Sequence, residues 1–435
     1  MTREIITIAV GGAGCRMALE FWRRLMAEHG IAANGRSARR LGADERPQAF
    51  FAETRAGQFA PRALFVDLGP DTADEVHAHE LRQVFHADSI VVGKTDAASS
   101  YARARALGGE TLLGRARDGV RKLVDAADNL QGFILFHAAG GGTGSGVAAA
   151  LLERLAVDYR KKSVVTFTLL PSRVFQRAAT EPYNAMFTVS ALRARSALSF
   201  VFDNDALYGL CQRSLALKDP SLADLNRLIG QAAADVTAPL RFADAEGGAD
   251  LGTLQTSLVR TPGRPFATLS LAPVATAAKL GSRHPNVPTI SKQVLAAQAC
   301  LAASDPGAAK TIAAMLIYRG DVAAKEINAS LTRLKAQRWP SFVAGASGIK
   351  ALQIDAKAAS VAGDARAAAS RTVTLLAATT ATASYLRERL GDSAASMRAE
   401  EAYFRWFTGA GVTADDFLSA QTDLQDLIDA YASLE

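Results

Sequence analysis

The sequence predicts an α/β protein built on a parallel sheet, because a buried strand, a glycine-rich turn and an amphipathic helix follow one another at two places. The second of these units has the apolar run Gly132–Phe136, the loop GGGTGSG at Gly140–Gly146 and the amphipathic stretch Val147–Leu155. The first has the apolar run Ile5–Val10 and the turn Gly11–Gly14, followed by a helical pattern. Short continuous apolar runs of this kind are typical of strands that helices cover on both faces.

The loop Gly140–Gly146 indicates an anion-binding site at the start of a helix. Without Cβ atoms, the backbone can turn sharply and point successive N–H groups at one ligand, and the helix dipole adds positive potential there. We expect Thr143 and Ser145 to add hydroxyl donors, and a bulky residue at Gly142 to fill the space of a phosphate. The loop is not of the Walker type, because no Gly-Lys-Ser/Thr follows it. A flexible linker is the alternative, but linkers are not placed between a buried strand and a helix.

A Rossmann dinucleotide site is the rival interpretation of the turn Gly11–Gly14. Met17 stands where the dinucleotide fingerprint has its third glycine, and no acidic residue closes a second strand at the usual distance. A dinucleotide-dependent enzyme is therefore the third of the functions that we consider.

Composition limits the class of protein. The chain has 435 residues, of which 49% are hydrophobic and 21% charged, and this describes a soluble globular protein of two or three domains. The net charge of +6 comes without a dense Lys/Arg run that carries aromatic residues, so we expect no nucleic-acid partner. Cys15, Cys211 and Cys300 are scattered and odd in number, which fits reduced thiols in the cytoplasm. No signal peptide is recognisable and no apolar run is long enough to span a membrane, so we expect a cytoplasmic protein.

The remaining elements follow from hydrophobic periodicity and turn residues. We expect a polar surface loop at 32–61, a helix at 112–128, and a long helix at 222–242 that Pro239 ends or kinks. Thr413 and Asp416 predict a capping box for the last helix. Further strands are expected at 62–68, 164–170, 200–204, 265–274, 311–318 and 372–376, and C-terminal helices at 383–390, 396–407 and 415–434.

Several segments resemble the tubulin and FtsZ superfamily and follow one another along the chain in the family's order. They are PRALFVDL at 61–68, GGGTGSG at 140–146, TEPYNA at 180–185, GGADLGTLQTSLV at 247–259, MLIYRGDVAAKEIN at 315–328 and YFRWFTGAGVTADDF at 403–417. Within the superfamily the chain looks most similar to bacterial tubulins and to an α-type subunit. The resemblance implies a Rossmann-like parallel-sheet GTPase domain at 1–221, a central helix at 222–243, an α+β intermediate domain at 244–371 and a C-terminal strand with helices at 372–435.

The resemblance also implies a site for GTP or GDP with Mg²⁺. Glu181 takes the position that contacts the ribose, Asn204 and Asn226 take those that read the guanine edge, and Asp67 takes that of a water-mediated magnesium contact. The other positions that match the nucleotide site are Gly11, Gly12, Ala13, Ser100, Gly140, Gly141, Gly142, Thr143, Gly144 and Leu222.

The chain departs from the family pattern at several nucleotide-contacting positions. Leu222 replaces the tyrosine that stacks on the guanine, and the other departures are Gly12, Cys15, Arg16, Gly69, Ser99, Ser100, Ala138 and Arg177. A lost hydrogen bond costs about 0.5–1.5 kcal/mol and a lost stacking contact about 1–3 kcal/mol. Two functions therefore compete: a cytoskeletal GTP-binding subunit of a head-to-tail filament, paired with itself or a paralogous tubulin-like subunit, and a degenerate, weakly binding regulator that does not polymerise.

In this superfamily one subunit binds the nucleotide and the next inserts an acidic loop, here 248–253. Asp250 matches the first acid of that loop and is the candidate catalytic residue in trans, but Thr253 replaces the second acid. Because a threonine hydroxyl cannot act as a base near neutral pH, we expect little GTP hydrolysis from this chain alone. The loop Leu280–Asn286 matches the family's lateral contact.

Overall fold

The computed structural model describes residues 3–434 except 43, 243–248, 282–284, 306–308, 337–340, 345 and 347. Within them, ten strands form one sheet in the order β11-β10-β12-β9-β8-β7-β6-β1-β4-β5. From β5 to β9 all neighbours are parallel, whereas β12 runs antiparallel to both β9 and β10. The strands are β1 Glu4–Val10, β4 Ala63–Asp67, β5 Ile90–Val92, β6 Leu130–Ala138, β7 Ser163–Leu170, β8 Leu198–Asp203, β9 Phe266–Ala272, β10 Thr311–Gly320, β11 Ile349–Ile354 and β12 Arg371–Thr379.

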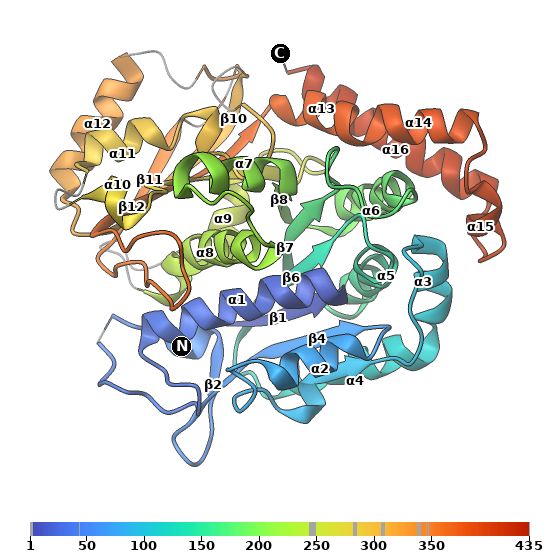
Figure 1. Cartoon of the computed structure of the whole chain (residues 1–435), viewed down its shortest axis with the longest axis horizontal. Helices are drawn as coiled ribbons and strands as arrows, with labels where there is room; N and C mark the ends of the chain where they lie inside the picture. The colour runs from blue at the N-terminus through green and yellow to red at the C-terminus, as the bar shows by residue number, and fades with distance from the viewer. Residues whose placement is uncertain are drawn as a thin grey trace.

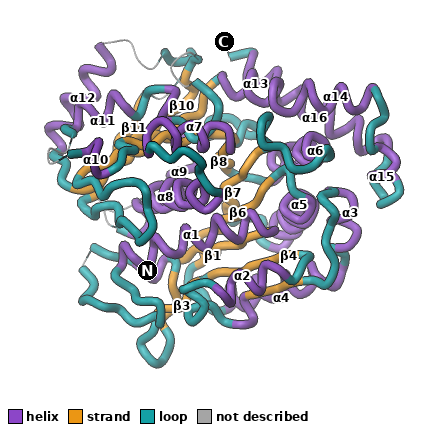
Figure 2. Tube along the Cα trace, in the orientation of Figure 1, coloured by secondary structure: helices purple, strands orange, loops and turns teal. Residues whose placement is uncertain are grey.

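Helices cover both faces of the sheet, as the purple and orange layers of Figure 2 show. Along β1, Ile5 and Ala9 belong to one buried cluster and Ile6, Ile8 and Val10 to the other, as the alternation of strand side chains requires. The helices of the first part of the chain are α1 Gly11–His29, α2 Asp71–Ala78, α3 Tyr101–Leu107, α4 Glu110–Asp125, α5 Gly142–Asp158, α6 Glu181–Arg195, α7 Asn204–Leu215, α8 Leu222–Arg241 and α9 Leu251–Leu258. Those that follow are α10 Ala277–Leu280, α11 Val287–Gln293, α12 Ala324–Ala336, α13 Ala381–Leu386, α14 Asp392–Ala399, α15 Phe404–Thr408 and α16 Ala414–Ala432.

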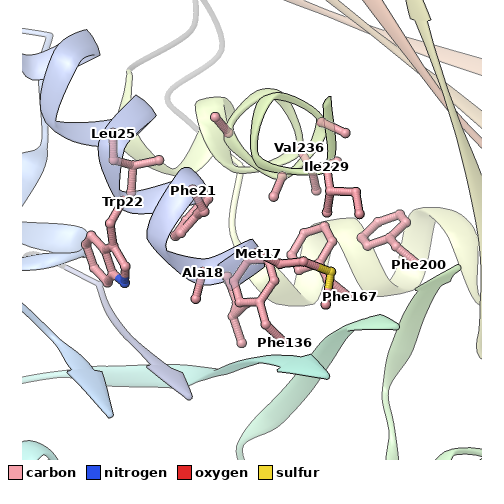
Figure 3. Close-up of a cluster of buried hydrophobic side chains, with 14 of the residues drawn as sticks. Met17, Ala18, Phe21, Trp22, Leu25, Phe136, Phe167, Phe200, Ile229 and Val236 are labelled. Carbon is pink, nitrogen blue, oxygen red and sulfur yellow. The ribbon is translucent and has the colours of Figure 1, made fainter. Parts of the chain in front are cut away.

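Helices α1 and α8 pack side by side on one face of the parallel strands (Figure 1). In Figure 3, Met17 and Phe21 of α1 and Ile229 of α8 turn toward the aromatic rings of β6, β7 and β8. The Phe136 and Phe167 rings stack with centroids 4.9 Å apart, and Phe167 and Phe200 with centroids 5.3 Å apart. The long helix predicted at 222–242 is confirmed as α8, which ends at Arg241, two residues after Pro239.

The C-terminal helices lie together over α6 (Figure 1). Thr413 and Asp416 form the predicted capping box, with 3.1 Å between the Asp416 nitrogen and the Thr413 hydroxyl. A single helix at 396–407 is wrong: α14 ends at Ala399, and Glu401 and Tyr403 have positive φ angles of 52° and 56° before α15 begins. A π-helical turn, Arg387–Gly391, joins α13 to α14.

The expectation of a polar surface loop at 32–61 is wrong for its second half. Phe50 and Phe51 are fully buried, and β2 (Phe51–Glu53) pairs with β3 (Phe59–Pro61) as a hairpin. These rings pack on Trp22 of α1, with centroids 6.3 Å and 5.3 Å away. Among the described residues, no helix combines the length and apolar character that crossing a bilayer requires.

Candidate nucleotide site

The loops at the carboxyl ends of β1, β4, β6, β7 and β8 meet at one edge of the sheet, because these strands are parallel. Open α/β sheets bind their ligands at such an edge. The two predicted glycine turns touch there: a Cβ on Gly11 would lie 2.9 Å from the backbone nitrogen of Gly144. Gly11 also has a φ of +75°, which side chains rarely adopt, so a glycine is required on both counts.

The glycine loop leads directly into α5, as predicted. Gly141 is the N-cap, and the first turn of the helix leaves backbone N–H groups without intrahelical partners. Gly141 is exposed, and a Cβ there would meet nothing within 4 Å, so the loop opens to solvent at this residue. The expectation that Ser145 offers its hydroxyl to a ligand is wrong, because this buried group donates to the Gly141 carbonyl at 2.5 Å. Thr143 lies in the first turn and is 7% exposed.

Asn184 ties the glycine loop to the loop that precedes α3. Its buried side-chain amide donates to the carbonyls of Gly140 at 2.8 Å and Ser99 at 2.7 Å, and its oxygen accepts from the Tyr101 nitrogen at 2.8 Å. Asn184 was not singled out from the sequence, although it lies in the TEPYNA segment. Its role becomes visible only when the two loops are seen to meet.

The segment 97–100 leaves no room at Gly142. A Cβ on Gly142 would lie 2.7 Å from the Ala97 Cβ and 2.9 Å from the Ser100 nitrogen. A larger residue there would therefore collide with this segment before it filled a phosphate's space, which corrects the reason given from the sequence. The Ser100 hydroxyl caps α3 by accepting from the Arg103 nitrogen at 3.4 Å.

Glu181 lies beside the glycine loop, where a ribose contact was predicted. A Cβ on Gly140 would lie 3.2 Å from its Cγ. Its carboxylate accepts hydrogen bonds from the Arg177 and Ala178 nitrogens at 2.9 Å and 3.2 Å. Burial nevertheless raises the pKa of Glu181, because those bonds only partly offset the desolvation.

The two asparagines of the predicted guanine pocket lie on neighbouring helices. Asn204 is the first residue of α7, Asn226 lies in the second turn of α8, and the two helices pack together. Both residues are half-buried, and neither amide is hydrogen-bonded to any described part of the chain. Leu222 is also half-buried and packs against the α1–α8 core. Amides that bond to none of the described residues keep both donor and acceptor available, which suits the hydrogen-bonding pattern of a purine.

Asp67 ends β4, next to the first glycine turn. A Cβ on Gly12 would lie 3.9 Å from Asp67 Oδ2, which also accepts from the Thr72 hydroxyl at 2.5 Å. Oδ1 accepts from the Leu68 nitrogen at 2.7 Å. Each oxygen keeps a lone pair for a water, so the carboxylate fits an outer-shell contact to Mg²⁺. No cluster of three or more His, Cys, Asp or Glu side chains in the described residues would hold a metal directly.

The sequence of this chain is similar to those of a known protein family. The Tubulin/FtsZ family, GTPase domain, matches residues 4–212, and the tubulin C-terminal domain matches residues 262–390. The chain is 37% identical over 433 residues to the tubulin alpha-2B chain of Physarum polycephalum, covering 99% of this chain and 96% of that one. It is also 37% identical over 433 residues to the tubulin alpha-1 chain of Pelvetia fastigiata, covering 99% and 95%.

The chain belongs to the tubulin/FtsZ family. Its GTPase domain implies guanine-nucleotide binding, and the ten-stranded sheet with helices on both faces is the tubulin-like α/β fold that the sequence predicted. The relatives named above are eukaryotic α-chains, which agrees with the α-type resemblance. The narrower likeness to bacterial tubulins rests on sequence alone and stays a prediction.

Asp250 of this tubulin-family chain lies at the opposite edge of the sheet from the glycine loops. It accepts a hydrogen bond at 2.6 Å from Arg3, which precedes β1, whereas Gly11 follows β1. The eight steps along the chain from Arg3 to Gly11 span roughly 26 Å at the rise of a parallel strand. Asp250 also caps α9, accepting from the Thr253 nitrogen at 2.6 Å and its hydroxyl at 2.7 Å. Gly248, at the start of this loop, lies outside the described residues, as do 282–284 of the predicted lateral contact.

His137, near the end of β6, contacts the backbone of the glycine loop. The ring is fully buried, with Nδ1 2.9 Å from the Gly144 carbonyl and Nε2 2.9 Å from the Thr168 hydroxyl. Burial lowers the pKa of His137 from 6.5 to about 4, because the charged imidazolium loses its hydration. The neutral ring therefore holds Gly144 in place.

We expect the stability of the protein to fall as the pH drops below 6.5. The unfolded chain takes up a proton on His137 there, but the folded protein does not until about pH 4. The lost contribution at pH 5 is about 2 kcal/mol. Urea unfolding at pH 7.5 and pH 5 measures it, and His137→Gln, which cannot titrate, should lose about 2 kcal/mol less than the wild type over this interval. Equal losses in the two proteins would contradict the assignment.

Proposed function

We propose that this protein is a GTP-binding subunit of a head-to-tail cytoplasmic filament, paired with itself or with a paralogous tubulin-like subunit. The observation that carries the proposal is the separation of Asp250 from the glycine loops. An acid at one edge of the sheet and a phosphate site at the other can complete one active site only between two molecules. A repeated contact of this kind is heterologous and generates a filament when its rotation does not close.

Exposed apolar side chains at the nucleotide edge support such a contact. Val174, in the loop after β7, is 74% exposed, and Trp406 of α15 is 65% exposed. In Figure 1, α15 lies at the same end of the molecule as α3, against which it packs. Large exposed apolar groups at one end of a molecule are typical of protein–protein interfaces.

Calorimetry and microscopy test the proposal together. We expect GTP and GDP with Mg²⁺ to bind more tightly than ATP, because Asn204 and Asn226 would face an adenine edge with mismatched donors. Negative-stain microscopy with GTP, with and without a candidate partner subunit, should show filaments. The absence of GTP and GDP binding at high micromolar protein would overturn the nucleotide assignment. A monomer under every nucleotide and partner condition would overturn the filament.

The second candidate is a non-polymerising regulator that binds nucleotide weakly. Two observations favour it: Leu222 offers no aromatic ring for a base to stack on, and Arg16 already donates to Glu75, with Nε 2.9 Å from Oε2. Measurable but weak GTP binding by a protein that sediments as a monomer with every partner would select this function.

Hydrolysis depends on the missing second acid. Because Thr253 donates its hydroxyl to Asp250 and carries no charge, we expect negligible phosphate release from GTP by the pure protein. Thr253→Glu should raise the rate of phosphate release if filaments of this chain form. Thr253→Gln should not, because glutamine has the size of glutamate but carries no charge. A phosphate-release assay measures all three proteins. Rapid turnover by the wild type would contradict this role of the loop.

A further inference from the structure

We infer that Arg389, from the C-terminal helical layer, is a positioning residue that sets the preference for guanine through Asn204. The inference rests on the proposed nucleotide function and adds a residue outside the sheet to its recognition site. It also implies that the guanine pocket and the C-terminal layer are mechanically connected.

The Arg389 guanidinium holds the two carboxylates that flank Asn204 in sequence. Its Nη2 lies 3.0 Å from Asp203 Oδ2, and its Nη1 pairs with Asp205. The Asp203 side chain is fully buried, and those of Asp205 and Arg389 are 15% and 11% exposed. A planar guanidinium can bridge two acids in this way, and a lysine ammonium cannot reproduce its fork.

The same carboxylates fix the start of α7. Asp203 Oδ1 accepts from the Asp205 nitrogen at 2.8 Å, so the backbone on both sides of Asn204 is tied to one ion-pair cluster. The Asn204 amide has no hydrogen bond of its own to the described residues. Its direction is therefore set by this backbone, and discrimination between purines requires its donor and acceptor to stay in place.

The cluster extends to the loop that leads to Glu181. Asp205 accepts hydrogen bonds from the Ser172 hydroxyl and, at 3.1 Å, from the Arg173 nitrogen. Arg389 thus fixes two carboxylates: that of Asp203, which holds the start of α7, and that of Asp205, which holds the start of this loop. Without Arg389, Asp203 and Asp205 would face each other as like charges, one of them buried, and would separate or take up a proton.

The test is the ratio of ATP to GTP dissociation constants, measured by calorimetry with Mg²⁺ on the full-length protein. We expect Arg389→Gln to weaken GTP binding by about tenfold, the equivalent of about 1.4 kcal/mol, and to leave ATP binding nearly unchanged. Arg389→Lys keeps the charge but loses the fork, so it should keep its thermal stability closer to wild type and still show a reduced ratio. If Arg389→Gln does not fold, Arg389→Lys carries the test.

Arg193→Gln is the matched control. Arg193 donates to the Asp423 carbonyl at 2.7 Å and so also anchors the C-terminal layer, but it does so from α6 to α16, away from α7. This variant should lose stability and keep the wild-type ratio. An unchanged ratio in the Arg389 variants, with a wild type that prefers GTP, would overturn this inference alone. A wild type without preference for guanine would overturn both the inference and the proposed function.

Discussion

Replacing Glu28 with glutamine should lower the free energy of unfolding by about 3–5 kcal/mol, the largest stability effect that we expect from one substitution. The side chain of Glu28, near the end of α1, is completely buried between two arginines. Its Oε1 lies 2.8 Å from Arg319 of β10, and its Oε2 lies 2.6 Å from Arg241 of α8. Arg319 also pairs with Asp235 at 2.7 Å.

Glu28→Gln lowers the stability because it leaves the buried positive charge of Arg241 without its counter-ion. Burial alone would raise the pKa of Glu28, but Arg319 and Arg241 outweigh it and hold the pKa at about 2, against 4.5 for a free glutamate. The contribution of the Glu28 carboxylate to the free energy of unfolding is thus fully present above pH 4.5. It is lost as the pH falls from 4.5 toward 2. Urea unfolding at neutral pH measures the change.

Glu80→Gln is the matched control for Glu28→Gln. Glu80 pairs with Arg23 of the same helix α1, but its side chain is 54% exposed. Exposed ion pairs contribute about 0–1 kcal/mol, so this variant should unfold almost as the wild type does. If the two variants lost the same small amount, the buried network would not be holding α1, α8 and β10 together.

The sequence predicted those features that depend only on residues close together in the chain. The strand, the glycine loop and the helix at 132–155 are contiguous, so periodicity and glycine content identify them together. The same is true of the capping box at Thr413 and of the end of α8 soon after Pro239. The continuous apolar strands likewise predict a parallel sheet with helices on both faces.

Features that depend on distant segments could not be predicted in this way. Glu28 and Arg319 look like ordinary polar residues of a helix and a strand, and only the packed structure brings them within hydrogen-bonding distance. Asn184 gains its role because two loops meet around it, and Ser145 loses its predicted role because its hydroxyl donates to the carbonyl of Gly141, the N-cap of its own helix. The turn at Tyr403 interrupts a helical pattern through backbone conformation, which periodicity does not report.

Gly142→Ala should abolish measurable GTP binding, the largest functional effect that we expect. The added Cβ would lie 2.7 Å from the Ala97 Cβ and 2.9 Å from the Ser100 nitrogen, closer than real Cβ atoms approach other groups. The second of these is backbone, so it cannot turn aside as a flexible side chain would. The segment 97–100 or the start of α5 must then move, and the N–H groups of the glycine loop would no longer point at one phosphate.

Gly141→Ala is the matched control, because it adds the same methyl group to the neighbouring residue. A Cβ at Gly141 would meet nothing within 4 Å, and its φ of −76° suits alanine, so the loop should keep its shape. Calorimetry with GTP and Mg²⁺ compares the variants, and circular dichroism checks that each is folded. We expect Gly141→Ala to retain binding within about tenfold of the wild type, since any loss reflects only a methyl group at the open mouth of the site. Wild-type affinity in a folded Gly142→Ala protein would show that the loop before α3 does not shape the phosphate site.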